Sequence, residues 1–307
     1  MVIPGRDHRE SEAVAGRDVN GPFTGQVGLD DIVSRIRALP IEGPPEDQRA
    51  AFAELVLGEA AEANEAPLRV RGHGGTIVYF HGGGYAFGSP QTHARIGHGL
   101  AERTRLDVML PAYPLAPEHT WPTQLEAALA AVAEAQPPLV LAGDSAGGHL
   151  ALVTSLELGR RGVRPAGLIL FSPNTDRTGL STTRGRNDPH DPMVDDEGDR
   201  ELARQCFAGV PDNDPQVSPL LDDLTLLPPL HIEVGAGEVL LDDSLLLAQM
   251  AREAGRSVTL HVEADGLHMM QLWAPWWKAA AASLDRAATF ALAVTGRRTT
   301  GWVDDAP

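Results

Sequence analysis

A serine flanked by glycines is the first part of this sequence whose residue types and spacing could do chemistry. Residues 143–147 read GDSAG, between the apolar run LVLAG (139–143) and the helical pattern AGGHLALVTSLELG (146–159). A sharp strand-to-helix turn exposes a serine hydroxyl at the edge of a sheet, and glycines two residues to either side remove side chains that would collide there. A chain with 32 glycines can produce this pattern by chance. Its place between a strand and a helix nevertheless predicts that Ser145 is a nucleophile.

A second glycine-rich segment, HGGGYAFG (81–88), follows the β-branched run TIVYF (76–80). Attack on an acyl carbonyl places negative charge on its oxygen, which backbone N–H groups stabilise where no side chain blocks their approach. We therefore expect the amides of Gly83, Gly84 and Ala146 to form an oxyanion hole. A dinucleotide-binding loop is the rival interpretation, but aromatic residues and a proline stand where a helix would open on the phosphates. The residues expected to support the loop and the serine are His81, Gly82 and Asp144.

A serine nucleophile needs a base, and after such a turn the chain order is serine, acid, histidine. His268 lies in ADGLHMM, a glycine-containing loop after the last apolar run. His231 and His261 fall inside strand patterns, where packed or solvent-facing side chains are expected. His268 is therefore the predicted base, because a loop at this point could place its imidazole over the serine.

The acid should follow the run HIEVG (231–235), where the chain continues as AGEVLLDDS (236–244). Glu238, Asp242 and Asp243 compete for the role. Asp242 and Asp243 stand just ahead of a helical pattern, where acidic residues commonly cap a helix or stabilise its dipole. Glu238 comes at the end of the strand, nearer to where an acid must meet a histidine, so we expect Glu238, with Asp242 in a supporting place.

The elements that must position these residues begin near Thr76, where short apolar runs alternate with longer helical patterns. This rhythm predicts an α/β fold with a mostly parallel central sheet and flanking helices. The expected strands are residues 76–80, 107–111, 139–143, 168–172, 231–235 and 258–262, with an antiparallel edge strand at 68–71. The expected helices are residues 93–104, 122–135, 146–160, 243–254 and 273–294.

Two segments depart from this rhythm. Residues 1–64 hold helical patterns at 31–39 and 46–57, and residues 174–219 hold one at 196–207 amid Pro, Gly and Asp. A structureless loop of that length is uncommon in a compact domain, so we expect both segments to form a helical cap over the strand ends. The expected division is a core at 65–173 and 220–296, cap segments at 1–64 and 174–219, and a flexible tail at 297–307.

Composition excludes several classes of function. The formal net charge of the 307 residues is −17, which would repel a polyanion such as nucleic acid. The single cysteine, Cys206, permits no intrachain disulfide and no cysteine-rich metal site, which fits the cytoplasm. The polar first residues and the absence of a long apolar run predict neither a signal peptide nor a membrane span. No metal or cofactor is expected, because the metal-ligand and phosphate-binding motifs are missing.

Taken together, these motifs resemble the hormone-sensitive-lipase family of α/β hydrolases. HGGG (81–84), YPLAPEH (113–119), GDSAGG (143–148), DPQVSPL (214–220), EVLLDD (238–243) and GLH (266–268) occur in the family's order. The resemblance implies the α/β-hydrolase fold and a bacterial-type carboxylesterase that prefers short or medium acyl chains of a small-molecule ester. The family's acid is usually an aspartate, and Glu238 falls at its position, 30 residues before His268. Within YPLAPEH we expect Glu118 and His119 to have internal partners.

Three alternatives remain at this stage. The same triad would serve an amidase, deacetylase or lactonase acting on a specialised metabolite, and the sequence does not separate these from an esterase. A non-catalytic receptor resembling the plant gibberellin receptor is disfavoured, because His268 is retained. A membrane-surface lipase is suggested by three tryptophans in the last helical pattern, which we instead expect to pack on the core or in a homodimer because that pattern has no basic face. These tryptophans are Trp273, Trp276 and Trp277.

Overall fold

The fold, seen in a computed structural model, is described for residues 21–58 and 66–297. A seven-stranded sheet runs through it in the order β1-β3-β2-β4-β5-β6-β7, and only the edge pair β1–β3 is antiparallel. The strands are β1 (Leu68–Val70), β2 (Thr76–Phe80), β3 (Asp107–Leu110), β4 (Leu139–Asp144), β5 (Gly167–Phe171), β6 (Leu230–Gly235) and β7 (Val258–Glu263). The predicted α/β fold is confirmed, and the strand boundaries agree within a residue.

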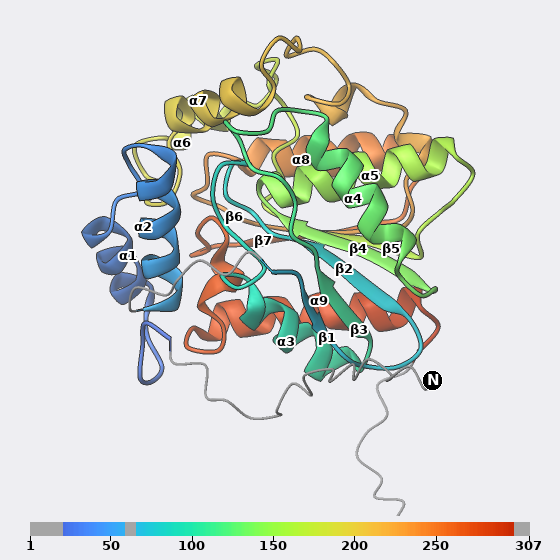
Figure 1. Ribbon diagram of the computed structural model, residues 1–307, viewed down its shortest axis with the longest axis horizontal. Helices are drawn as coiled ribbons and strands as arrows, with labels where there is room; N and C mark the ends of the chain where they lie inside the picture. Colours follow the sequence, from blue (N-terminus) through green and yellow to red (C-terminus); the bar gives the residue numbers. More distant parts are fainter. Residues whose placement is uncertain (1–20, 59–65, 298–307) are drawn as a thin grey trace, which may run out of the picture.

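Helices cover both faces of the sheet, as Figure 1 shows. On one face lie α3 (Ala94–Thr104) and α9 (Lys278–Val294). On the other lie α4 (Thr123–Ala133), α5 (Ala146–Arg160) and α8 (Leu241–Glu253). Strands β2, β5 and β6 are buried along their whole length, because each face packs into one of two apolar cores. This explains the continuous apolar runs in the sequence, which are typical of parallel strands.

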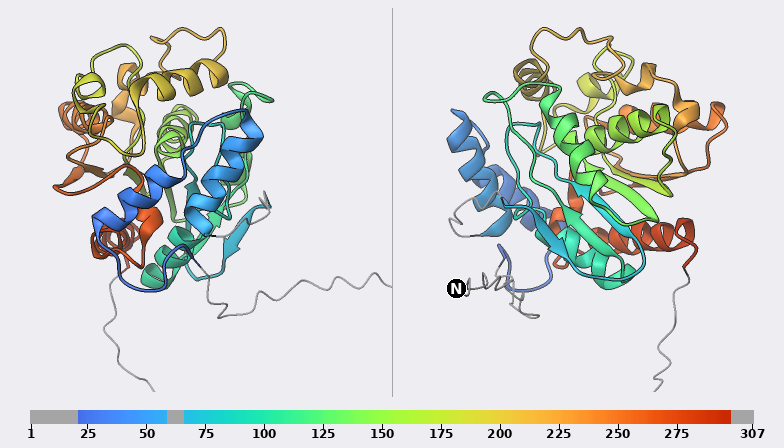
Figure 2. Two further views of the ribbon diagram at one scale, coloured as in Figure 1. Left: turned by 90° about the vertical axis from the view of Figure 1, so that its left-hand side faces the viewer. Right: turned by 45° about the vertical axis from the view of Figure 1, so that its right-hand side comes forward.

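The two segments that interrupt the sequence rhythm contain helices in the structure as well. The first holds α1 (Leu29–Ala38) and α2 (Pro45–Leu57), and the second holds α6 (Thr183–Asn187) and α7 (Asp196–Cys206). Figure 2 (left) shows α1, α2 and α7 together on one side of the molecule. Most of the expected tail (297–307) and the first 20 residues lie outside the described part. The helix α6 and two 3-10 turns, Pro219–Leu221 and Leu224–Leu226, were not expected.

The prediction of one continuous helix over residues 273–294 is wrong. A 3-10 turn, Met270–Trp273, is followed by a break, and α9 begins only at Lys278 with Trp277 as its N-cap. Pro275 explains the break, because proline lacks the N–H that a helix interior requires. Trp273, Trp276 and Trp277 are buried in this connection rather than spaced along a helix.

A buried group of ions fastens the segment around α6 and α7 to the core. Arg184, only 3% exposed, donates from Nη1 to Asp199 Oδ2 of α7 at 2.7 Å and from Nη2 to Asp243 Oδ1 of α8 at 3.1 Å. Arg177 also donates to Asp199 Oδ2, at 2.6 Å. These charges hold the pKa of Asp199 below its usual value even though burial alone would raise it.

We expect Arg184→Met to lower the free energy of unfolding by about 3–5 kcal/mol, because it leaves the buried carboxylate of Asp243 without its partner charge and removes one of the two arginines that pair with Asp199. The measurement is denaturant unfolding, with Arg186→Met as the matched control on the same helix. Arg186 is exposed, so its replacement should change stability by no more than about 0.5 kcal/mol. Equal stabilities of the two variants would contradict the prediction.

Candidate active site

Ser145 lies at a sharp turn between β4 and α5. Its φ of 52° and ψ of −120° place a non-glycine residue in a strained part of backbone space. A Cβ atom on Gly143 would collide with the carbonyl of Gly147, and one on Gly147 would collide with the carbonyl of Phe80. The turn therefore requires both glycines of the GDSAG pattern, which is the steric reason that the pattern exists.

His268 and Glu238 are in direct contact. Nδ1 of His268 lies 2.9 Å from Oε2 of Glu238, and each side chain is only 1% exposed. The other carboxylate oxygen, Oε1, accepts hydrogen bonds from the Ser172 hydroxyl at 2.8 Å and from the Gly235 amide at 2.5 Å. Every contact of this carboxylate thus holds it in one orientation against the imidazole.

The remaining ring nitrogen of His268 is available for chemistry. Its Nε2 has no hydrogen-bond partner among residues 21–58 and 66–297. Ser145 and His268 line the same cavity. When Nδ1–H donates to Glu238, Nε2 carries the lone pair that a general base needs.

Charges around His268 set its affinity for a proton. Burial lowers the pKa of His268, but the hydrogen bond and charge of Glu238, with the charges of Asp191 and Asp144, outweigh burial and raise the pKa above 6.5.

The glycine loop after β2 takes a conformation that suits glycine. Gly83 and Gly84 have φ values of +113° and +58°, and a Cβ atom on Gly83 would collide with the Phe87 carbonyl. The carbonyl of Gly83 accepts from Ala86 and Phe87 at 2.9 and 3.0 Å, whereas within the described chain the amides of Gly83 and Gly84 donate to no acceptor. The amide of Ala146 opens α5 and has no intrahelical acceptor either.

The expected supporting residues lie behind this loop. Asp144 Oδ1 accepts from the Tyr79 hydroxyl at 2.7 Å and from the Gly82 amide at 3.1 Å, so the Gly82 amide is occupied. Nδ1 of His81 lies 2.9 Å from the Gly82 carbonyl. Burial, followed by the charge of His93, lowers the pKa of His81 to about 3. A histidine that stays neutral in this way suits an anchor of the loop better than a carrier of protons.

Asp242 and Asp243 lie in the first turn of α8, which agrees with the expected partners of the helix dipole rather than with caps. The helix begins at Leu241 with Leu240 as its N-cap, and both carboxylates of the first turn also contact the chain that follows β5. Asp242 Oδ2 accepts from the Thr182 hydroxyl at 2.7 Å, and Asp243 Oδ1 accepts from the amide of Thr175 at 2.8 Å. The structure thus places Glu238, and neither aspartate, against His268.

Glu118 of the YPLAPEH segment has a partner, but not an internal one. Its carboxylate pairs with Arg49 of α2 at 2.6 Å, and its side chain is 51% exposed. His119 is recorded only through backbone hydrogen bonds, including its carbonyl, which accepts from Gln124 at 2.8 Å. The segment therefore joins the first helices to the core, and within the described residues neither Glu118 nor His119 makes the buried side-chain hydrogen bond expected of it.

The cavity beside Ser145 and His268 is small, at about 180 Å³. It lies below the ~300–1,000 Å³ that is usual for pockets of drug-sized ligands. Its apolar walls come from the loop between α1 and α2, the glycine loop, the stretch between α6 and α7, α7 itself and the loop that carries His268. These apolar residues are Ile41, Phe87, Met193, Val194, Leu202 and Met269.

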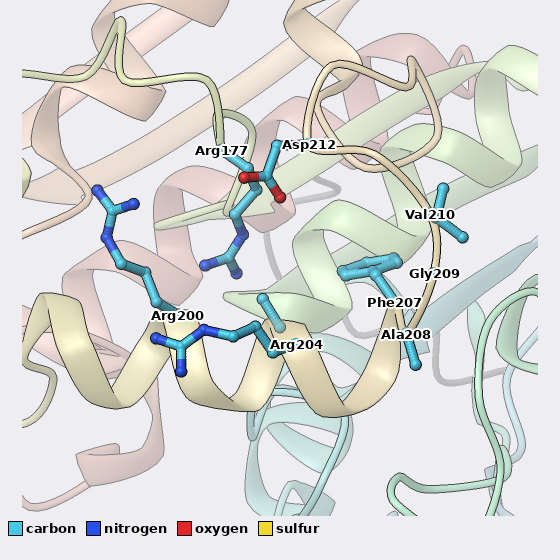
Figure 3. Close-up of a pocket in the computed structure, with 9 residues that line it drawn as sticks. Arg177, Arg200, Arg204, Phe207, Ala208, Gly209, Val210 and Asp212 are labelled. Atoms are coloured by element: carbon cyan, nitrogen blue, oxygen red, sulfur yellow. The ribbon is translucent and has the colours of Figure 1, made fainter.

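A second hollow, of about 240 Å³, lies on the other face of α7. Figure 3 shows Arg177, Arg200 and Arg204 around it, with Phe207 at one side. None of the predicted site residues lines it. Each arginine pairs with a carboxylate, Arg200 with Asp196 at 2.8 Å and the others within the α7 region.

Three residues near the site were not found from the sequence. Ser172, with a φ of 45°, directly follows β5 and binds Glu238, while Asn187 and Asp191 reach the loop of Glu238 from residues 183–191, called the α6 segment below. No sequence motif indicates these three residues, because most of their partners are backbone groups that come close only in the folded chain. The β-strand ending in FSPN was the nearest available signal, since strand ends gather at one edge of a parallel sheet.

Residues 77–272 match the family described as having the alpha/beta hydrolase fold. A solved esterase of the bacterial hormone-sensitive lipase family superposes with a TM-score of 0.78 at 29% identity, covering 88% of this chain and 97% of its own. The chain belongs to the hormone-sensitive-lipase family of α/β hydrolases.

Two curated relatives indicate the broad activity of this α/β hydrolase. An esterase from Acinetobacter venetianus is 34% identical over 77% of this chain and 78% of its own length. An acetyl-hydrolase from Streptomyces hygroscopicus is 34% identical over 74% of this chain and 78% of its own length. The α/β hydrolase is accordingly a carboxylic ester hydrolase.

The described part of this α/β hydrolase has neither a cluster of metal ligands nor a membrane-spanning helix. No group of three or more His, Cys, Asp or Glu side chains there could hold a metal ion. Of the helices in residues 21–58 and 66–297, none is long and apolar enough to cross a bilayer. The homodimer and the cytoplasmic location expected from the sequence stay predictions.

We expect the acidic limb of the pH–kcat/KM profile to have its midpoint above pH 6.5. The base must be neutral to accept a proton, so activity should rise as pH increases through the raised pKa of His268. Initial rates on a non-ionising ester across pH 5–9 provide the measurement. A midpoint below 6.5 would contradict the charge arrangement described for His268.

Proposed function

We propose that this chain hydrolyses short-chain carboxylic esters through a Ser145–His268–Glu238 triad and an acyl-enzyme. The observation that carries the proposal is the buried contact of His268 Nδ1 with Glu238, which leaves Nε2 unpartnered in the cavity that Ser145 lines. The strained backbone at Ser145 and the family's activity as ester hydrolases both support this proposal.

In the proposed cycle, His268 Nε2 takes the proton of the Ser145 hydroxyl as its oxygen attacks the ester carbonyl. Glu238 keeps the imidazole in the tautomer with Nδ1–H and stabilises the imidazolium. The oxyanion is stabilised by the amides of Gly83, Gly84 and Ala146. The C–O bond breaks, His268 returns the proton to the alcohol, and water then attacks the acyl-enzyme by the same route to release the acid.

We further propose that the segments before residue 65 and from 174 to 219 act as a cap that limits the acyl group. Ile41 and Gln48 come from the first segment, and Met193, Val194 and Leu202 come from the second, and all line the cavity. Helices from both segments therefore bound the space beside Ser145. The cavity volume of about 180 Å³ favours acyl chains of a few carbons.

Shorter acyl chains should accordingly be hydrolysed faster. We expect kcat/KM for p-nitrophenyl butyrate to exceed that for the palmitate ester by at least about tenfold, because the long chain does not fit a cavity of this volume. Spectrophotometric release of nitrophenol measures this, and Ser145→Ala, which should lose on the order of a million-fold in turnover, sets the background. Comparable rates on both esters would refute a bounded pocket.

The role of the acid has its own test in Glu238→Gln beside Asp242→Asn. The glutamine amide can hold the wrong imidazole tautomer, so turnover should fall by up to about ten-thousand-fold with little change in KM. Asparagine at 242 keeps an oxygen that can accept from Thr182, so kcat should stay within about threefold. The opposite ranking of the two variants would assign the acid to Asp242.

A further inference from the structure

The loop that carries Glu238 is held from outside the core by the α6 segment. Asn187 Nδ2 donates to the carbonyl of Glu238 at 2.8 Å. The next amide, that of Val239, donates to Asp191 Oδ2 at 3.0 Å. The peptide bond on the C-terminal side of the acid thus has its carbonyl and its amide held by two side chains of one segment.

The same segment also forms hydrogen bonds to the residues that follow this peptide bond. The Thr183 hydroxyl donates to the Val239 carbonyl at 2.9 Å and accepts from the Asp242 amide at 2.8 Å. The turn from Glu238 into α8 is therefore hydrogen-bonded to residues 183–191 along its length. Core hydrogen bonds fix the carboxylate, whereas this segment fixes the backbone that bears it.

Asp191 also connects the acid's loop to the wall of the cavity. Its second oxygen, Oδ1, accepts from the amides of Met193 and Val194 at 2.9 and 3.2 Å. Both of these residues line the cavity beside Ser145. One carboxylate thereby holds the backbone of the acid's loop and the backbone of the substrate-facing wall together.

We propose that Asp191 is a positioning residue for ester hydrolysis, which joins the backbone of the acid's loop to the cavity wall and adds negative charge behind His268. The inference rests on the proposed function, because it assigns Asp191 an effect on the base of that triad. Packing of the α6 segment against the core and alignment of Glu238 then depend on each other, since the Asp191 carboxylate takes part in both.

Several charged groups face His268 or the space behind it. Glu238 contacts the imidazole from the loop after β6, Asp144 contributes from the end of β4, and Asp191 contributes from the α6 segment. The hollow next to Asp191 and Glu238 has a volume of about 270 Å³. Its other charged or titratable lining residues are Arg37, His190 and Asp265.

The test is Asp191→Asn, which keeps the shape of the side chain, removes its charge and leaves one oxygen to accept amides. We expect kcat to fall by about tenfold with KM within about twofold, because alignment of the base is lost and substrate contacts are kept. The acidic limb of the pH profile should move down by about half a pH unit, since a negative charge near the imidazolium is gone. Asn187→Ala removes a hydrogen bond to the Glu238 carbonyl but no charge. Its kcat should therefore fall, while the midpoint of the acidic limb should stay at the pH of the unmodified protein.

Asp265→Asn is the matched control. Asp265 lines the same hollow from the loop before His268, is exposed, and makes no hydrogen bond within the described residues. Its replacement should leave kcat and the acidic limb as in the unmodified protein. If Asp265→Asn shifted the acidic limb as much as Asp191→Asn, the proposal would be overturned. A charge in the hollow would then affect His268 without any contact to the loop of Glu238.

The outcomes also separate this inference from the proposed function. A Ser145→Ala enzyme that still turns over would refute the triad itself. An inactive Ser145→Ala enzyme beside an Asp191→Asn enzyme with unchanged kcat and pH profile would refute only the role of Asp191. Thermal unfolding shows whether each variant folds, and if Asp191→Asn does not, an unchanged kcat in Asn187→Ala overturns the proposal.

Discussion

Helix α5 begins so close to strand β2 that a single methyl group at Gly147 would overlap the carbonyl oxygens of Phe80 and His81. This contact sets the geometry of the whole catalytic edge. It allows the chain to reverse at Ser145 with a positive φ, and it brings the first amide of the helix next to the glycine loop that follows β2. Sheet, helix and loop therefore meet at one point, and a larger residue there would disturb all three.

The opposite side of the site depends on hydrogen bonds rather than on close packing. Glu238 is fixed by a hydroxyl from the end of β5, by an amide at the end of β6 and, through its backbone, by the α6 segment. The turn at Ser145 is thus fixed by packing within the core. The loop of Glu238, in contrast, also depends on hydrogen bonds from a segment outside the sheet. The backbone strain at Ser145 and the alignment of Glu238 therefore come from different parts of the chain.

Much of this could be predicted from the sequence because the decisive features are local. The parallel strands appear as continuous apolar runs, and the turn at Ser145 has a steric pattern only five residues long. The hydrogen-bond partners of Asp191 and Asp242 could not be predicted, since both aspartates bind groups about fifty to sixty residues away in the chain. The final helix was misplaced because alanine-rich periodicity continues across Pro275, and the apolar tryptophans before α9 match that periodicity without being helical.

Helix α7 separates two hollows and presents a different charge to each. Toward the cavity beside Ser145 lie Asp199 and Glu201, whereas Arg200 and Arg204 line the hollow on the other face. Within the described residues, no lysine or arginine lines the cavity itself. These charges are paired, because Asp199 contacts Arg177 and Arg184, and Glu201 contacts Arg204 of the same helix. The two hollows are therefore electrostatically connected, since loss of Arg204 on one face of α7 would leave Glu201, on the face toward the cavity, without this partner.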